Sequence, residues 1–235
     1  MEAHNALDDF MPIFGKPSIR RTRKPSQEFE KKIEIKDGRT EYQPRKKWYR
    51  EDTPFAEIKT AYPFVFSEEH DFIARRHTQT GRPVAVLEWG CGNGRAISEI
   101  AEKYGVKVAT YGFSEDSYME WENRTNVKFI HQTPHKLLRY IRNGSIDLIY
   151  SFFGIHHMLK EPKYWEYFGK LVDKLSTGGK MVFHVAFADP RMTEPFIEGL
   201  GGFLHQKTDV DYHGLNYMVA ENRPHLGAAI YITKK

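Results

Sequence analysis

The sequence predicts an α/β fold, with a doubly wound and mainly parallel sheet and an antiparallel strand at one edge. Between residues 84 and 187, short apolar runs alternate with segments of helical periodicity. A glycine cluster directly follows the first of these runs, as at a strand-to-helix turn. Two further β-like segments, near 215–220 and 228–233, leave no room for a helix between them. We therefore expect these two segments to pair antiparallel.

Each element has its own local signal. Apolar runs bounded by proline or glycine predict strands at 84–87, 106–111, 127–130, 146–151 and 181–187. Ser67 followed by two glutamates predicts a helix over about 68–78, because a hydroxyl caps a helix and acids suit its first turn. Helical spacing predicts four more helices: one that buries Ala96, Ile97, Ile100, Ala101 and Tyr104, a short one at 117–124, one that buries Leu137, Leu138 and Ile141, and one that begins near Pro162. Gly178 and Gly179 are expected to separate the last helix from the strand at 181–187.

Residues 1–50 are predicted to form an irregular basic N-terminal arm, and residues 51–235 a single domain. The first ten residues carry a formal net charge of −3 and residues 11–50 a net charge of +8. Because the whole chain carries +4, the domain itself is close to neutral. The arm has four prolines and no sustained apolar periodicity, so we expect no packed core within it.

The cellular compartment is inferred from cysteine content and from the first residues. The single cysteine, Cys91, excludes an internal disulfide and is typical of a reducing compartment. The sequence contains no run of about 18 apolar residues, which a membrane-spanning helix would need. The first 15 residues also lack the basic start of a signal peptide. We therefore expect a cytoplasmic protein without a membrane partner. The sequence does not indicate an oligomeric state.

The strongest functional signal lies at residues 86–94, where a strand ends, three glycines stand at alternate positions and a helix begins. Glycine allows a sharp turn and lets a ligand approach the main chain, and the helix then presents unpaired N–H groups to that ligand. A dinucleotide fingerprint needs its third glycine at the position of Arg95, whereas this chain has it at Gly94. An acid, Glu88, stands two residues before the first glycine.

This arrangement resembles the first motif of the class I (Rossmann-like) S-adenosyl-L-methionine-dependent methyltransferases. The resemblance extends to residues 147–157, which are similar to the fourth-strand motif of small-molecule members. It extends further to residues 175–180, where the family often has a proline-glycine-glycine turn. It implies S-adenosyl-L-methionine as the cofactor. It also implies a direct displacement in which the protein aligns the acceptor, the methyl carbon and the sulfur, and excludes water.

The resemblance also implies a set of cofactor-binding positions, which are Glu88, Gly90, Cys91, Gly92, Asn93, Gly94, Ser114, Glu115, Thr133, Ser151 and Phe152. Two positions depart from the family pattern. The acid that commonly binds the ribose falls on Ser114, so either Ser114 makes a weaker hydrogen bond or Glu115 supplies the carboxylate after a one-residue shift. The aspartate near the adenine is matched by Thr133. Either hydroxyls and backbone hold the cofactor, or its affinity is reduced.

The paired His156 and His157 directly follow the predicted fourth strand. A histidine near its neutral pKa can take a proton from a methyl acceptor, so His156 is the candidate catalytic base. Because neighbours in an extended backbone point to opposite sides, only one of the pair is expected to face the acceptor. The alternative is that both are packing residues. No metal site is expected, because no further ligand stands at suitable spacing nearby.

Several acceptors remain open. A small-molecule acceptor is expected first, from the resemblance over residues 151–157 and the supply of aromatic side chains. RNA or a nucleic-acid-bound protein is the alternative, because residues 16–50 are basic and Trp48 and Tyr49 are available for stacking. A solvated tail would carry the same charges. A non-catalytic methyltransferase-like binding protein is a further alternative, supported by the missing acids, whereas the glycine spacing argues against a nicotinamide-dependent dehydrogenase.

Overall fold

The computed structural model describes residues 52–152, 154–159, 164–186, 193–206, 210–218 and 226–235. The predicted arm at residues 1–50 lies outside these ranges, so its boundary with the domain stays a prediction. No helix in the described ranges combines the length and the apolar character that a bilayer crossing requires.

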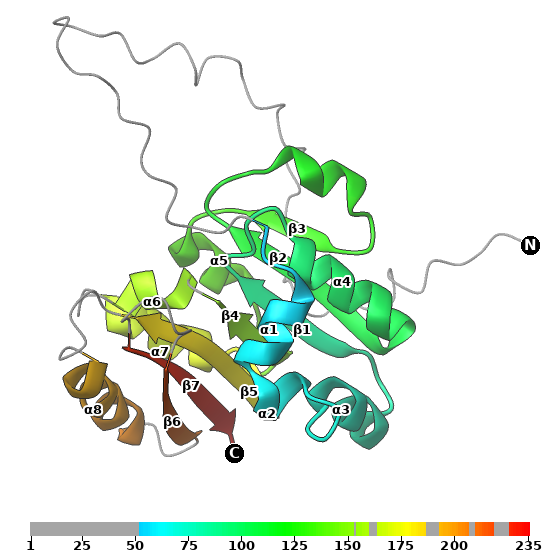
Figure 1. Ribbon diagram of the computed structural model, residues 1–235. Coiled ribbons are helices and arrows are strands. Elements are labelled where there is room, and N and C mark those ends of the chain that lie inside the picture. The colour runs from blue at the N-terminus through cyan, green and yellow to red at the C-terminus, as the bar shows by residue number, and fades with distance from the viewer. Residues whose placement is uncertain (1–51, 153, 160–163, 187–192, 207–209, 219–225) are drawn as a thin grey trace, which may run out of the picture.

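Within the described ranges, seven strands form one sheet at the centre of the molecule (Figure 1). Their order across the sheet is β3 (Lys128–His131), β2 (Val108–Ser114), β1 (Val84–Trp89), β4 (Ile146–Ser151), β5 (Leu175–Ala186), β7 (Leu226–Lys234) and β6 (Val210–Met218). The first five of these run parallel, and β7 is antiparallel to both β5 and β6. The predicted doubly wound, mainly parallel sheet with an antiparallel edge is therefore confirmed.

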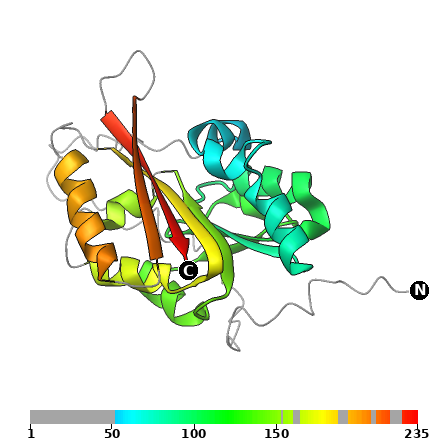
Figure 2. The same cartoon turned by 90° about the horizontal axis from the view of Figure 1, so that it is seen from below.

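Helices cover both faces of this sheet (Figures 1 and 2). One face packs against α1 (Phe55–Ala61), α2 (Pro63–Phe66), α3 (Phe72–Thr80) and α4 (Arg95–Tyr104). The other packs against α5 (Pro134–Tyr140), α6 (Gly154–Leu159), α7 (Trp165–Val172) and α8 (Thr193–His205). The chain order reverses between β1 and β4, and the crevice beyond the carboxyl ends of strands at such a switch point is where open α/β sheets bind ligands.

The sequence periodicity correctly predicted α4 and misplaced several element ends. All five residues expected on the apolar face of α4 are buried. The helix expected from residue 68 instead begins at Phe72, because Asp71 provides the cap and its carboxylate accepts a hydrogen bond from the Ala74 amide at 2.9 Å. Ser67 ends α2. A 3-10 turn at Gly105–Lys107 occupies the start of the strand predicted at 106–111, so β2 begins at Val108, and the helix predicted at 117–124 is a 3-10 turn at Met119–Asn123.

The fifth strand begins earlier than the glycine pair predicted. β5 starts at Leu175 and runs through Gly178 and Gly179, which were expected to break the chain before residue 181. Its pairing with β4 shifts register between Ile146 and Leu148, and Gly178 has a positive φ of 73°. These are the marks of a bulge, which bends a strand without ending it.

Candidate functional site

The glycine loop between β1 and α4 is tied to the neighbouring strand through its backbone. The Phe113 carbonyl at the end of β2 accepts hydrogen bonds from the amides of Gly90 and Cys91, at 2.8 and 2.9 Å. The Gly94 amide donates to the Cys91 carbonyl at 2.8 Å. Among the described residues, no acceptor is present for the amides of Gly92 and Asn93. These two N–H groups are therefore the ones that the loop offers to a ligand.

Packing inside the protein accounts for two of the three glycines, which were expected to make room for a ligand. Their φ angles are positive, 79° at Gly90 and 80° at Gly94. A Cβ at Gly90 would lie 3.0 Å from the Gly154 Cα, at the start of α6. A Cβ at Gly94 would lie 2.3 Å from the ring of Phe129 on β3. The contact at Gly90 also brings the first and the fourth-strand motifs together.

Side chains brace the loop from outside. The Trp121 indole donates to the Gly92 carbonyl at 2.9 Å and stacks on Phe129, with ring centroids 4.8 Å apart. The Asn93 side chain donates to Asp52 at 3.0 Å and accepts from the Arg95 amide at 3.1 Å. The polar atoms of the Asn93 side chain therefore have partners within the protein. These contacts preorganise the backbone of the loop.

Glu88 is a buried acid without a full set of partners. Its side chain faces the α1–α4 layer, and its Oε2 atom has no hydrogen-bond partner among the described residues. The same holds for the hydroxyl of Tyr150 on the adjacent strand β4. Burial raises the pKa of Glu88 to about 8, although the neighbouring Tyr150 hydroxyl and the Ile97 amide oppose the shift. A buried carboxyl in this condition is destabilising until a donor or a cation reaches it.

Cys91 is buried in the same region. Burial raises the pKa of its thiol well above the ordinary value, and Glu88 adds to the shift. The thiol therefore stays protonated at neutral pH, which suits a small spacer in the loop and not a nucleophile.

The predicted ribose and adenine positions lie at the carboxyl ends of β2 and β3. Ser114 ends β2, and its hydroxyl accepts a hydrogen bond from the Asp116 amide at 3.2 Å. Glu115 is exposed, and its carbonyl accepts from the His131 ring at 2.9 Å. Thr133 is exposed and immediately precedes α5. Which of these side chains contacts a cofactor stays a prediction.

The fourth-strand motif turns into a helix at once. The Ser151 hydroxyl, fully buried, accepts a hydrogen bond from the Ile155 amide at 2.9 Å, which fixes the start of α6. His156 and His157 lie within this helix, so the extended backbone expected for them is wrong. Their side chains lie outside the described part of the structure, and the catalytic role of His156 stays a prediction.

A buried aromatic group beside the end of β4 was not predicted. The Tyr62 hydroxyl, from the junction of α1 and α2, donates to the Ser151 carbonyl at 2.6 Å. It also lies 2.8 Å from Nδ1 of His184 on β5. The Phe152 ring makes edge contacts with both, at centroid distances of 6.4 and 5.1 Å. Nothing in the spacing of these residues indicates the cluster, because Tyr62 and His184 are 122 residues apart.

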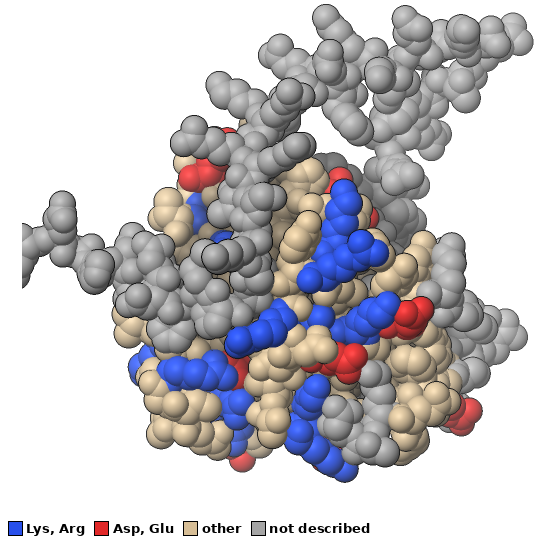
Figure 3. All heavy atoms as spheres, turned by 180° about the vertical axis from the view of Figure 1, so that it is seen from behind, with Lys and Arg blue, Asp and Glu red and all other residues tan. Residues whose placement is uncertain are grey.

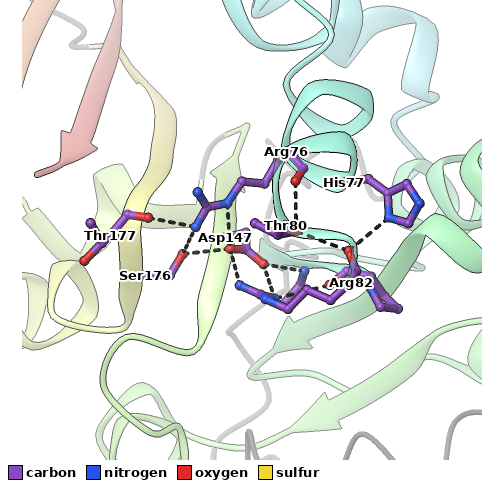
Figure 4. Close-up of polar contacts among 9 residues, drawn as sticks. Arg76, His77, Thr80, Arg82, Asp147, Ser176 and Thr177 are labelled. Carbon is purple, nitrogen blue, oxygen red and sulfur yellow. Dashed lines mark hydrogen bonds and ion pairs between the residues drawn. The ribbon is translucent and has the colours of Figure 1, made fainter.

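A second buried acid, Asp147, lies at the opposite edge of the sheet (Figure 4). Arg82 donates to both of its oxygens at 2.8 Å, and Arg76 donates at 3.1 Å. The Ser176 hydroxyl and the Ala85 amide complete the set, at 2.7 and 3.0 Å. Burial alone would raise the pKa of Asp147, but the Arg82 guanidinium and the Ala85 amide hold it below its ordinary value. This cluster ties α3, β1, β4 and β5 together.

Among the described residues, no three His, Cys, Asp or Glu side chains gather as metal ligands would.

Comparison with known proteins agrees with this architecture. A family model described as a methyltransferase domain matches residues 86–179, from the first strand through the turn in β5. No curated protein matches the chain by sequence.

Solved structures share the fold. Two structures of the plantazolicin methyltransferase BpumL, with S-adenosylhomocysteine (SAH) and a triazolic or a pentazolic desmethyl analogue, superpose with TM-scores of 0.52 and 0.51 at 14% and 13% identity. Each comparison covers 78% of this chain and 86% of the other. The 1,6-didemethyltoxoflavin-N1-methyltransferase of Burkholderia thailandensis is 17% identical over 77% of this chain and 86% of its own, with a TM-score of 0.49. At these identities the likeness to BpumL establishes the Rossmann-like fold.

Proposed function

We propose that the chain is a class I S-adenosyl-L-methionine-dependent methyltransferase that transfers a methyl group to a small-molecule acceptor, because a methyltransferase-domain model matches residues 86–179 and the fold is Rossmann-like. The aromatic cluster of Tyr62, Phe152 and His184 beside the end of β4, in which Tyr62 and His184 are buried and Phe152 is partly buried, carries this proposal. Aromatic rings suit a compact, largely apolar acceptor, whereas a nucleic-acid strand needs an open and basic groove.

The glycine loop and Glu88 have the chemistry that the family's cofactor needs. S-adenosyl-L-methionine supplies an electrophilic methyl group on a sulfonium, and its amino-acid end carries a carboxylate and an ammonium. The Gly92 and Asn93 amides would hold the carboxylate, as helix-start amides hold anions. The unpartnered Glu88 oxygen would pair with positive charge, which would lower the pKa of Glu88 and relieve its burial. Ser114 and Glu115 would hold the ribose.

The structures of BpumL support a compact acceptor by analogy of fold alone. That enzyme was solved with desmethyl plantazolicin analogues and SAH. Its low identity to this chain leaves the identity of the acceptor here to experiment.

RNA is the second candidate, and two observations favour it. Seen from behind, the molecular surface shows more lysine and arginine than aspartate and glutamate (Figure 3). In addition, Asp52, the first described residue, contacts Asn93 and Arg95 of the cofactor loop. The basic arm at residues 11–50 therefore joins the domain next to the proposed methyl donor. An arm attached there would carry a bound strand toward the reaction centre.

One labelling experiment separates the two acceptors. The protein is incubated with S-adenosyl-L-methionine carrying a tritiated methyl group and an extract of its own cells, which is then divided into a low-molecular-mass filtrate, RNA and protein. Label in the filtrate that survives nuclease treatment supports the small-molecule proposal. Label confined to RNA, and lost when residues 1–50 are deleted, would establish the alternative instead. A Gly92→Val variant is the control, because a β-branched side chain at a positive φ next to the ligand should block cofactor binding.

A further inference from the structure

The orientation of the peptide group between Gly92 and Asn93 decides where the Asn93 N–H group points. The Trp121 indole donates a hydrogen bond to the Gly92 carbonyl at 2.9 Å. In a trans peptide the carbonyl and the N–H that follows it point in opposite directions, so the Asn93 N–H points away from Trp121. The Cys91 carbonyl is fixed in the same way by the Gly94 amide, at 2.8 Å, and the Gly92 N–H points away from that contact. Each of the two ligand-facing amides is therefore oriented through the carbonyl of its own peptide group.

The Gly92–Asn93 peptide group needs an outside contact to hold it. Gly92 has a φ of 52°, and glycine rotates about its backbone bonds at lower cost than other residues. The Asn93 side chain bonds Asp52 and the Arg95 amide, but neither contact involves the peptide oxygen. The Cys91 thiol also contacts the Gly92 carbonyl, at 3.6 Å, but a thiol is a weak donor. The indole N–H of Trp121 is therefore the stronger hold on this peptide group.

Trp121 is in turn supported by a ring on β3. Its indole stacks on Phe129 with an angle of 6° between the ring planes. The Phe129 ring occupies space that two glycines leave, because a Cβ would lie 2.3 Å from it at Gly94 and 2.7 Å from it at Gly112. The sheet order places the switch point, between β1 and β4, on the side of the loop opposite β3. An N–H that points away from Trp121 and Phe129 therefore points away from β3 and toward the side where the ligand crevice lies.

We infer that Trp121 is a positioning residue for the cofactor. It holds the Gly92–Asn93 peptide group so that the Asn93 N–H meets the carboxylate at the amino-acid end of S-adenosyl-L-methionine. The inference rests on the proposed function and adds to the same site a residue that is 29 positions from Gly92 and belongs to none of the sequence motifs. A donor that is already oriented binds an anion without a further entropy cost of ordering the loop.

The test compares two ligands that differ at the amino-acid end. SAH carries the carboxylate, whereas 5′-methylthioadenosine shares the adenosine and the thioether but lacks the amino-acid end. Trp121→Phe removes the indole N–H and keeps a ring to stack on Phe129. By calorimetry we expect this variant to bind SAH about two- to tenfold more weakly, which corresponds to one neutral hydrogen bond, and methylthioadenosine with nearly the wild-type affinity. Equal weakening of both ligands would indicate a general structural role and would overturn the inference.

The wild-type protein supplies a second measurement, which decides even if the variant does not fold. In amide proton–nitrogen correlation spectra, SAH should shift the Gly92 and Asn93 signals, and methylthioadenosine should shift them much less. In Trp121→Phe the shift of the Asn93 signal on adding SAH should be smaller than in the wild type. If both ligands shift the two wild-type signals equally, these amides do not hold the carboxylate, and the inference is overturned.

Trp165→Phe is the matched control. The Trp165 indole also donates to a backbone carbonyl, that of Leu159 at 3.0 Å, and it packs against Phe196 and Phe203 of α8, on the other face of the sheet. We expect its affinities for both ligands to equal those of the wild type, and a selective loss of SAH affinity here would overturn the inference. If Trp121→Phe binds SAH as tightly as the wild type, the inference is overturned and the proposed function stands. If the wild-type protein binds neither SAH nor S-adenosyl-L-methionine, the proposed function is overturned and the inference with it.

Discussion

Two buried carboxyl groups lie on adjacent strands of the same sheet, and they are in opposite chemical states. Asp147, at the start of β4, is surrounded by donors from Arg82, Arg76, Ser176 and the backbone, and its pKa is held low. Glu88, near the end of β1, has an oxygen without a partner among the described residues, and burial raises its pKa to about 8. Both side chains are almost completely excluded from solvent.

We propose that this difference separates a structural site at Asp147 from a ligand site at Glu88. A buried charge that is fully paired holds elements together and has no remaining capacity for a ligand. A buried acid with an unpaired oxygen costs stability in the free protein, and such a cost is expected where a ligand will supply the missing partner. The unpaired acid, Glu88, lies near the carboxyl end of its strand, and the paired acid, Asp147, lies near the amino end of its strand. This agrees with the rule that open α/β sheets bind ligands at their carboxyl ends.

The largest effect is expected for Asp147→Asn. Removing this charge leaves the Arg76 and Arg82 guanidinium groups without their buried partner, and breaking such a cluster costs about 3–5 kcal/mol of unfolding free energy. Denaturant unfolding measures the loss, and calorimetry with SAH should show unchanged affinity. Glu166→Gln, which breaks the exposed ion pair with Lys170, is the control and should leave stability nearly unchanged. A stable Asp147→Asn protein would contradict the structural role.

Glu88→Gln is expected to act in the opposite direction on stability. In the folded protein Glu88 keeps its proton up to about pH 8, whereas in the unfolded chain it loses the proton near 4.5. The folded state then binds one more proton over this range, so wild-type stability falls as pH rises, by up to about 1.4 kcal/mol per pH unit. The glutamine variant lacks this slope and should be the more stable protein near pH 8. Parallel stability curves for the two proteins would show that Glu88 titrates normally.

The raised pKa of Glu88 also predicts that cofactor binding releases a proton. If Glu88 pairs with positive charge on the cofactor, it must ionise on binding, so below about pH 8 one proton is released. Affinity should therefore rise with pH, by up to about tenfold per unit, and level off above that value. Calorimetry in two buffers of different ionisation enthalpy counts the proton directly. The glutamine variant should release none and bind more weakly by about 1.5–3 kcal/mol, the range for a hydrogen bond to a charged group. Binding without proton release in the wild type would exclude this pairing.

Much of the fold could be predicted because its signals are local. The periodicity of α4 and the apolar run of β1 are repeated patterns, and both elements are where the sequence placed them. The errors arose where local preference and tertiary pairing disagreed. Gly178 and Gly179 favour a break, but β4 pairs with Leu175 before them and with Lys180 after them, so β5 continues through them as a bulge. Ser67 is a good cap, but Asp71 is the residue that the fold uses.

The site was predictable only where its residues are close in sequence. Spacing singled out the glycine loop, and the family resemblance implied Glu88; that these residues bind the cofactor stays a prediction. Neither revealed that Glu88 lacks a partner, because that depends on what packs around β1 from α4 and β4. The contact between Tyr62 and His184 joins segments 122 residues apart, and no periodicity encodes such a pair. The histidines that the sequence emphasised, His156 and His157, stand out only because they are adjacent.

The ribose end offers the last comparison, because Glu115 is an exposed acid and Ser114 is a buried hydroxyl, and the smallest effect of all is expected if Ser114 is the one that binds. If Glu115 replaces the missing ribose-binding acid, Glu115→Ala should weaken SAH binding by about 1.5–3 kcal/mol, and if Ser114 binds instead, Ser114→Ala should weaken it by about 0.5–1.5 kcal/mol. The serine variant needs a stability control, because its hydroxyl also accepts the Asp116 amide. Partial desolvation of its carboxyl and the neighbouring Asp116 raise the pKa of Glu115, so a contribution from its carboxylate should weaken as pH falls toward that pKa. A Ser114 contribution should not change with pH. If both variants bind SAH as the wild type does, the ribose is held by backbone groups, and the departures from the family pattern at these positions carry no cost in affinity.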